Sequence, residues 1–148
     1  MTDSPIAGAD NNTGSYQNTR SIKGMEVSHQ HPPREVSSQS PIPSVSHLMF
    51  PDVMDGFNVQ ILTRHFTFTP ASINQAPNNN QGHAHIYVND VKIARVYSSW
   101  FHLPRSLFKT GDNVVKVTLN ANDHGEWSIN GNPISSVVKV VIPAPKSR

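Results

Sequence analysis

The chain has 148 residues, of which 36% are hydrophobic and 15% are charged, and its formal net charge is +2. This length suits one domain of common size, and the scattered Lys and Arg residues provide no basic stripe for binding nucleic acid. No apolar run approaches the roughly 18 to 20 residues that cross a bilayer. The absence of cysteine excludes disulfides, zinc-thiolate sites and a blue-copper centre.

Residues 1–44 are rich in Ser, Asn, Gln, Gly and Pro and include the stretch HQHPPREVSSQSPIP. Proline forbids regular helix and central strand, so we predict a flexible N-terminal arm over this range. Residues 45–143 change to short apolar runs broken by turn residues, which is typical of an all-β domain. Residues 144–148 form a short tail.

The first half of the predicted domain contains two strong strand signals. Residues 57–68 alternate at Phe57, Val59 and Ile61 and then change phase, which predicts a bend near Leu62. A polar loop covers residues 71–82, and a hairpin follows over residues 83–97 around the turn pair Asn89-Asp90. Residues 98–113 are expected to be a connection with a short apolar centre.

The second half of the domain contains three further strand signals. Residues 114–123 place Val115, Val117 and Leu119 on one face, and Asn130-Gly131 is the strongest hairpin turn pair in the chain. Residues 135–142 provide the last strand. No window carries a helical stripe of useful length. About seven short strands without helices predict an antiparallel β-sandwich that is immunoglobulin-like or cupredoxin-like in outline.

Eight histidines are the unusual feature of the composition, and two of them stand in the motif GHAHIY. Alternation along a strand places His83 and His85 on one face and Ala84, Ile86 and Val88 on the core face. We expect the two histidines to lie outward on an accessible surface, with Cα atoms roughly 6.6 Å apart. Two imidazoles at this spacing can converge on one metal ion, although a solvated surface pair is the alternative interpretation.

A metal site needs further donors from neighbouring segments. His124, directly after the strand 114–123, is the preferred third ligand, and His102 is a fourth or alternate ligand. Asn120, Asn122 and Asp123 lead up to His124 and are expected to support it by hydrogen bonds. Three neutral imidazoles suit copper, zinc or nickel better than calcium or magnesium.

The remaining histidines divide into two groups. Met25, His29 and His31 in the arm form a donor set that favours Cu(I), unless they belong to a tail without a binding role. His47 and His65 are interpreted as structural, with His65 in the middle of a strand.

The blocks FNVQI, FTFTPASIN, GHAHIYVNDVKIARVY, WFHLP and VTLNANDH carry a resemblance. Over residues 43–142 the chain resembles small extracytoplasmic bacterial β-sandwich proteins, cyanobacterial ones among them. It is more loosely similar to periplasmic copper-binding CopC-like and PCuAC-like domains. The resemblance implies a periplasmic or secreted protein, its signal peptide removed, that binds copper through His83, His85 and His124.

Two departures from these families bear on the metal. PCuAC-like domains use a His-x-Met element, whereas this chain has His-x-His, so Cu(II) and zinc become candidates beside Cu(I). CopC-like sites often use an N-terminal histidine, and this chain begins with Met1.

We therefore predict a metal-binding protein, most consistent with copper and alternatively zinc, that serves in transport, storage or delivery to a metal-acceptor protein. It is expected to be a monomer or dimer, without nucleic acid or a membrane span. No nucleophile elbow, phosphate loop or paired-carboxylate spacing is present, which favours a carrier over an enzyme. A metal-dependent oxidoreductase using the same histidines is an alternative, because three ligands leave a position open.

A further alternative is an adhesive or carbohydrate-binding module in which Trp100, Phe101 and Tyr87 form an aromatic platform. For the metal-binding hypothesis, affinity should fall below roughly pH 6.5, because only neutral imidazole binds metal.

Overall fold

A computed structural model describes residues 32–146 of the chain. Within this range the regular structure is almost entirely β-strand, which confirms the all-β prediction. The strands are β1 (Pro33–Glu35), β2 (Ser44–Pro51), β3 (Phe57–Arg64), β4 (Thr67–Phe68), β5 (Gln81–Val88), β6 (Val91–Val96), β7 (Trp100–Leu103), β8 (Gly111–Asn120), β9 (Glu126–Ile129), β10 (Asn132–Pro133) and β11 (Ser135–Ile142). Two single 3-10 turns, η2 (Pro70–Ser72) and η3 (Arg105–Leu107), complete the described elements.

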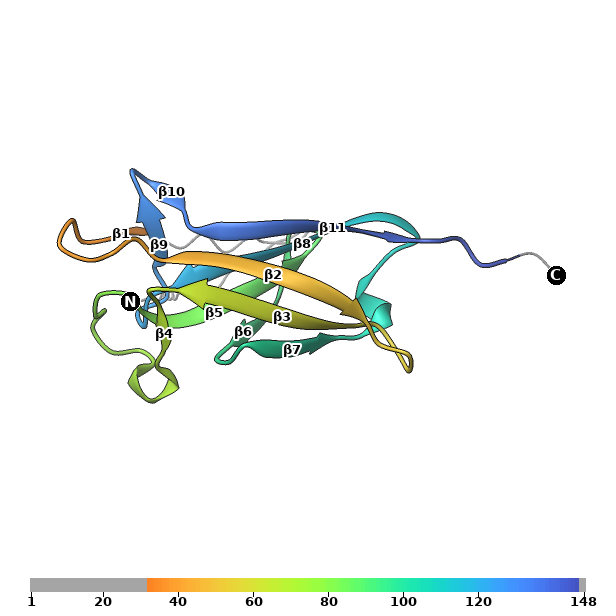
Figure 1. Cartoon of the computed structure of the whole chain (residues 1–148), viewed down its shortest axis with the longest axis horizontal. Coiled ribbons are helices and arrows are strands. Elements are labelled where there is room, and N and C mark those ends of the chain that lie inside the picture. Colours follow the sequence, from red (N-terminus) through yellow and green to blue (C-terminus); the bar gives the residue numbers. More distant parts are fainter. Residues whose placement is uncertain (1–31, 147–148) are drawn as a thin grey trace, which may run out of the picture. The chain divides into compact units, whose positions relative to one another are not determined.

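The strands form two sheets (Figure 1). The smaller sheet has the order β2-β3-β7 and is antiparallel. In the larger sheet β5 and β8 are central neighbours, with β6 paired to β5 and β11 paired to β8. The short strands β4 and β9 extend the larger sheet at one end, where β1 and β10 pair with β9.

Both sheets contribute to one hydrophobic core. Val59 and Ile61 of β3 and Leu103 of β7 belong to the same buried cluster as Ile86 of β5 and Val117 of β8, and each is at most 1% exposed. Burying an aliphatic side chain of this size contributes about 1.5 to 3 kcal/mol, so the alternating apolar residues hold the two sheets together.

The two hairpin turns lie where the sequence predicts them. Asn89 and Asp90 connect β5 to β6 with φ angles of 51° and 67°, and Asn130 and Gly131 connect β9 to β10 with φ angles of 52° and 79°. Positive φ at both central residues matches the right-handed twist of the paired strands, and Asn, Asp and Gly adopt it most readily.

The predicted bend near Leu62 is displaced. Leu62 continues β3 on its outer side and is 42% exposed, whereas the chain turns at His65, whose φ is 53°. The structural assignment of His65 to the middle of a strand is therefore wrong: the residue is an exposed bend residue. After it, the backbone N–H of Thr67 donates to the carbonyl oxygen of Asn80 at 3.0 Å, and the chain joins the larger sheet as β4.

Strand β1 lies inside residues 1–44, the range predicted to form the flexible arm. It pairs in parallel with β9 and is an edge strand of the larger sheet. Pro33 is therefore tolerated there, because an edge strand does not need every backbone N–H. The carboxylate of Glu35 accepts hydrogen bonds from the backbone N–H groups of Asn130 (2.8 Å) and Gly131 (2.7 Å), which anchors β1 to the β9–β10 turn.

Strand β7 lies within the segment predicted as a connection. Its four residues pair with β3, from Phe57 opposite Leu103 to Gln60 opposite Trp100. A strand this short gains its order from the partner strand rather than from its own propensity.

Among residues 32–146 there is no helix with the length and apolar character required to span a bilayer.

Candidate metal site

Strand β5 carries two histidines of the candidate site. His83 lies opposite Asn120 of β8, and His85 lies opposite Thr118. The preceding Gly82 has a φ of 149°, and a Cβ atom there would lie 1.8 Å from the carbonyl oxygen of Asn120. Glycine in the GHAH motif therefore allows β5 to approach β8 closely, immediately before the first histidine.

The face of these histidines is as predicted, but their exposure is not. His83, His85 and Tyr87 share the side of β5 opposite the core, and they are 0%, 0% and 9% exposed. The expectation of an outward, accessible pair is therefore wrong, and other rings pack beside His83 on this side of the sheet. The ring centroids of His124 and Tyr97 lie 5.1 Å and 5.8 Å from that of His83.

The turn between β8 and β9 supplies the third histidine. In this turn the N–H of Ala121 donates to the carbonyl oxygen of Gly125 at 2.7 Å, and the N–H of His124 donates to that of Ala121 at 2.8 Å. His124 has a φ of 74°, so the chain reverses at this residue. As expected from the sequence, Asn120 supports it: the Asn120 side-chain amide donates to the His124 carbonyl oxygen at 3.1 Å.

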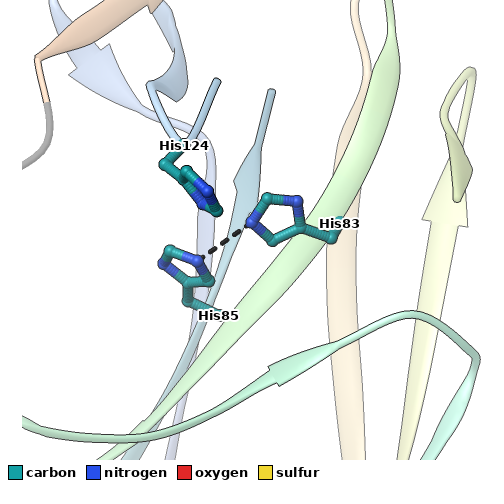
Figure 2. Close-up of side chains that lie close together, drawn as sticks. All are labelled: His83, His85 and His124. Atoms are coloured by element: carbon teal, nitrogen blue, oxygen red, sulfur yellow. Dashed lines mark hydrogen bonds between the residues drawn. The ribbon is translucent and has the colours of Figure 1, made fainter. Parts of the chain in front are cut away.

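The three imidazoles form a compact cluster (Figure 2). The Nε2 atoms of His83 and His85 are 3.0 Å apart and hydrogen-bonded, and one ligand nitrogen from each of His83, His85 and His124 lies within 4.8 Å of the others. Metal–nitrogen bonds of about 2.0 to 2.1 Å at tetrahedral angles separate two ligand nitrogens by about 3.3 Å. The separations in the cluster are at most 4.8 Å and so exceed this spacing by no more than about 1.5 Å, which side-chain rotation can close.

Asn74, in the polar loop between η2 and β5, contacts the third histidine directly. Its side-chain oxygen Oδ1 lies 2.7 Å from Nε2 of His124. The loop is tied to the same turn, because the backbone N–H of Asn74 donates to the carbonyl oxygen of Asn122 at 2.8 Å. Sequence reasoning missed Asn74, and its only local signal is an Asn in a polar segment, a residue type that tolerates the observed φ of 66°.

Two other polar residues expected to support His124 have different partners. The Asn122 amide donates to the Thr69 hydroxyl at 2.9 Å, which fastens the loop to the turn. Asp123 forms an ion pair with Arg34 of β1. Both residues hold the segment that carries His124 without a hydrogen bond to its ring.

The electrostatic surroundings of His124 favour its neutral form. Burial lowers the pKa of His124 below its ordinary value of 6.5, the charges of Arg95 and Lys92 lower it further, and Asp123 opposes them. Arg95 belongs to β6 and lies opposite His85 in the β5–β6 pairing. A neutral imidazole retains a lone pair for a metal ion, so the surroundings favour the ligand form of His124.

His102 does not join this cluster, so the expectation of a fourth or alternate ligand there is not met. It belongs to β7 in the smaller sheet and lies opposite Asn58 of β3. Its Nδ1 atom is 2.8 Å from the Asn58 side-chain oxygen. The two residues lie on the outer side of that sheet, because Val59 and Phe101, which follow the opposite alternation, pack in the core.

His47 lies in structural surroundings, as predicted. It is 3% exposed in β2, and its Nδ1 atom lies 2.8 Å from the Ser136 hydroxyl of β11. Burial lowers its pKa. The donor set of Met25, His29 and His31 lies outside the described residues.

The aromatic residues expected to form one platform do not share a face. Trp100 is 52% exposed on the outer side of the smaller sheet, where its ring lies 5.9 Å from that of Phe50. Phe101 points into the core and Tyr87 belongs to the larger sheet. Trp127 is a core residue whose Nε1–H donates to the carbonyl oxygen of Gln81 at 3.0 Å.

Comparison of the chain with protein-family models, with curated proteins and with solved structures finds no match.

Proposed function

We propose that the protein binds one transition-metal ion through His83, His85 and His124. The observation that carries the proposal is the convergence of three imidazoles from two separate segments, with ligand nitrogens within 4.8 Å of one another. A pair of histidines on one strand is a common surface feature, but a third imidazole held by a constrained turn makes a set of donors that matches a transition ion.

Copper is the proposed ion, and zinc is the alternative. Three nitrogen donors without a carboxylate or thiolate suit Cu(I), Cu(II) and Zn(II), and they disfavour calcium and magnesium, which require oxygen ligands. The neighbouring positive charges of Arg95 and Lys92 add no ligand. They favour an ion of low charge or an anion at the remaining coordination position.

The proposed role is transport, storage or delivery of the ion outside the cytoplasm, with transfer to a metal-acceptor protein. A carrier requires only reversible coordination at a set of donor groups, and the three clustered imidazoles supply that set. A metal-dependent oxidoreductase would turn over a substrate with the loaded protein, so assays of the copper form with peroxide and phenols distinguish the two roles.

Metal titration of single variants tests the site. We expect untagged wild-type protein to bind one equivalent of Cu(I) or Zn(II), and His83→Ala, His85→Ala and His124→Ala each to lose most of the affinity. His65→Ala and His102→Ala are matched controls, because neither histidine belongs to the clustered group. Unchanged stoichiometry and affinity in all three site variants would refute the proposal.

We also propose that the fold is an immunoglobulin-like sandwich. The order β2-β3-β7 in one sheet and β6-β5-β8-β11 in the other supports this, because it matches two antiparallel sheets joined by connections that cross between them. The short strands β1, β4, β9 and β10 would then be additions at one end, next to the histidine cluster.

Carbohydrate binding is a second candidate function, favoured by one observation. Asn58, Trp100 and His102 line a hollow of about 310 Å³ on the outer side of the smaller sheet, and Phe101, whose side chain packs against the core, also borders it. An exposed indole beside amide and imidazole groups can stack on a sugar ring and hydrogen-bond its hydroxyls. This function would be supported if the protein binds polysaccharides, Trp100→Ala abolishes the binding and His83→Ala preserves it. Failure of the wild-type protein to bind any member of a glycan panel would exclude this function.

A further inference from the structure

The histidine cluster also determines which ring nitrogen of each histidine faces the metal ion. This inference rests on the proposed function. We propose that the ion is bound by Nε2 of His83, Nε2 of His85 and Nδ1 of His124. We also propose that Asn74 selects Nδ1 of His124 by its hydrogen bond to the other ring nitrogen of that histidine. In this role Asn74 is a positioning residue rather than a ligand.

The two histidines of β5 use Nε2 because these atoms already face each other. Their separation of 3.0 Å is close to the spacing of two ligands on one ion, whereas the other nitrogens of the two rings point away from each other in Figure 2. Alternate residues on a strand share one face, so both imidazoles of β5 can reach the same ion.

His124 uses the other nitrogen because Asn74 occupies Nε2. The Asn74 oxygen Oδ1 can only accept, so at 2.7 Å the Nε2 atom of His124 is the donor and carries the proton. A neutral imidazole has one N–H, which leaves the lone pair on Nδ1. The two ring nitrogens point in different directions, and Figure 2 shows the ring of His124 directed toward the two imidazoles of β5.

Asn74 is held firmly enough to impose this choice. Its backbone N–H is bonded to the carbonyl oxygen of Asn122 in the turn that carries His124, and the Asn122 side chain is bonded to Thr69 at the start of η2. Three hydrogen bonds therefore join the loop that carries Asn74 to the turn that carries His124: Asn74 N–H to Asn122, Asn122 to Thr69, and Asn74 to the His124 ring. Partners of this kind around a ligand usually contribute 10- to 100-fold in metal affinity.

Two substitutions at residue 74 separate orientation from loop structure. Asn74→Gly removes the acceptor and accepts the φ of 66° without strain. Asn74→Asp keeps an acceptor at the same distance from the backbone. Asn79→Gly is the control, since Asn79 is exposed in the same loop and its backbone N–H donates to the Asn78 side-chain oxygen at 3.0 Å. We expect Asn74→Gly to lower Zn(II) affinity about 10- to 100-fold, whereas Asn74→Asp and Asn79→Gly stay within about threefold of wild type.

Long-range proton–nitrogen NMR spectra of the full chain, labelled with ¹⁵N-histidine and loaded with Zn(II) alone, test the ligand atoms. We expect zinc on Nδ1 of His124 with a proton on its Nε2, and zinc on Nε2 of His83 and His85. Zinc bound through Nε2 of His124, or equal affinities for Asn74→Gly and wild type, would overturn this inference and leave the proposed function intact. Failure of wild-type protein to bind either Zn(II) or Cu(I) would instead overturn the proposed function.

Discussion

Substitution of Gly82 by alanine tests whether the approach of β5 to β8 builds the site. The added Cβ would lie 1.8 Å from the Asn120 carbonyl oxygen and 2.9 Å from its carbon, and the φ of 149° is one that alanine rarely adopts. The strands must separate by more than about 1 Å to relieve these contacts, which breaks hydrogen bonds beside the His83–Asn120 pair. Overpacking costs about 1 to 3 kcal/mol and each lost hydrogen bond about 0.5 to 1.5 kcal/mol.

We therefore expect Gly82→Ala to lower the free energy of unfolding by about 3 kcal/mol and to weaken metal binding by displacing His83. Gly131→Ala is the matched control, because Gly131 also has positive φ, at 79°, but no atom within 4 Å of an added Cβ. The control should cost about 1 to 2 kcal/mol for its backbone conformation alone. Urea unfolding followed by circular dichroism compares the two variants, and equal losses would refute the steric argument.

Three further predictions concern His47, His124 and Asn113. Because burial lowers the pKa of His47, its contribution to stability is present above about pH 6.5 and is lost as the pH falls further. His47→Leu should therefore reduce the loss of unfolding free energy between pH 7.5 and 5.5 in metal-free protein, and an unchanged loss would contradict the assignment. Arg95→Gln removes a positive charge that lowers the pKa of His124, so NMR titration of metal-free protein should show this pKa rise, and a constant or lower pKa would argue against the contact. Asn113 is 1% exposed, and its side chain donates to the carbonyl oxygens of Lys109 and Gly111 and accepts from Asn89. Asn113→Leu should cost about 2 to 3 kcal/mol in urea unfolding, whereas a loss below about 0.5 kcal/mol would show that these bonds contribute little.

Short-range patterns in the sequence were sufficient for much of the fold. Alternation assigned Ala84, Ile86 and Val88 to the core, where they are 0%, 0% and 2% exposed, because side-chain direction follows the strand period alone. The turn pairs at Asn89 and Asn130 were likewise found from residues that tolerate positive φ. Strand β7 was missed because its order depends on pairing with β3, which no local pattern reveals.

The sequence predicts which three histidines form the candidate site. It does not predict their burial or the residue that hydrogen-bonds the ring of His124. The sequence predicts His124 as the third donor because it follows a strand whose core face is occupied by apolar residues, and the structure brings it beside His83 and His85. The burial of the pair was not predictable, because it depends on packing by residues from other elements. Asn74 lies 50 residues before His124, and the hydrogen bond between them follows from tertiary folding alone.

The 3.0 Å contact between the β5 imidazoles has a kinetic consequence. A hydrogen bond between two Nε2 atoms needs a proton on one of them, yet an ion bridging both needs two lone pairs. One ring must therefore move its proton from Nε2 to Nδ1 before both can coordinate. Since neither side chain is exposed, this tautomer exchange is a step of its own, and ion uptake should slow when the protein is transferred from H₂O to D₂O.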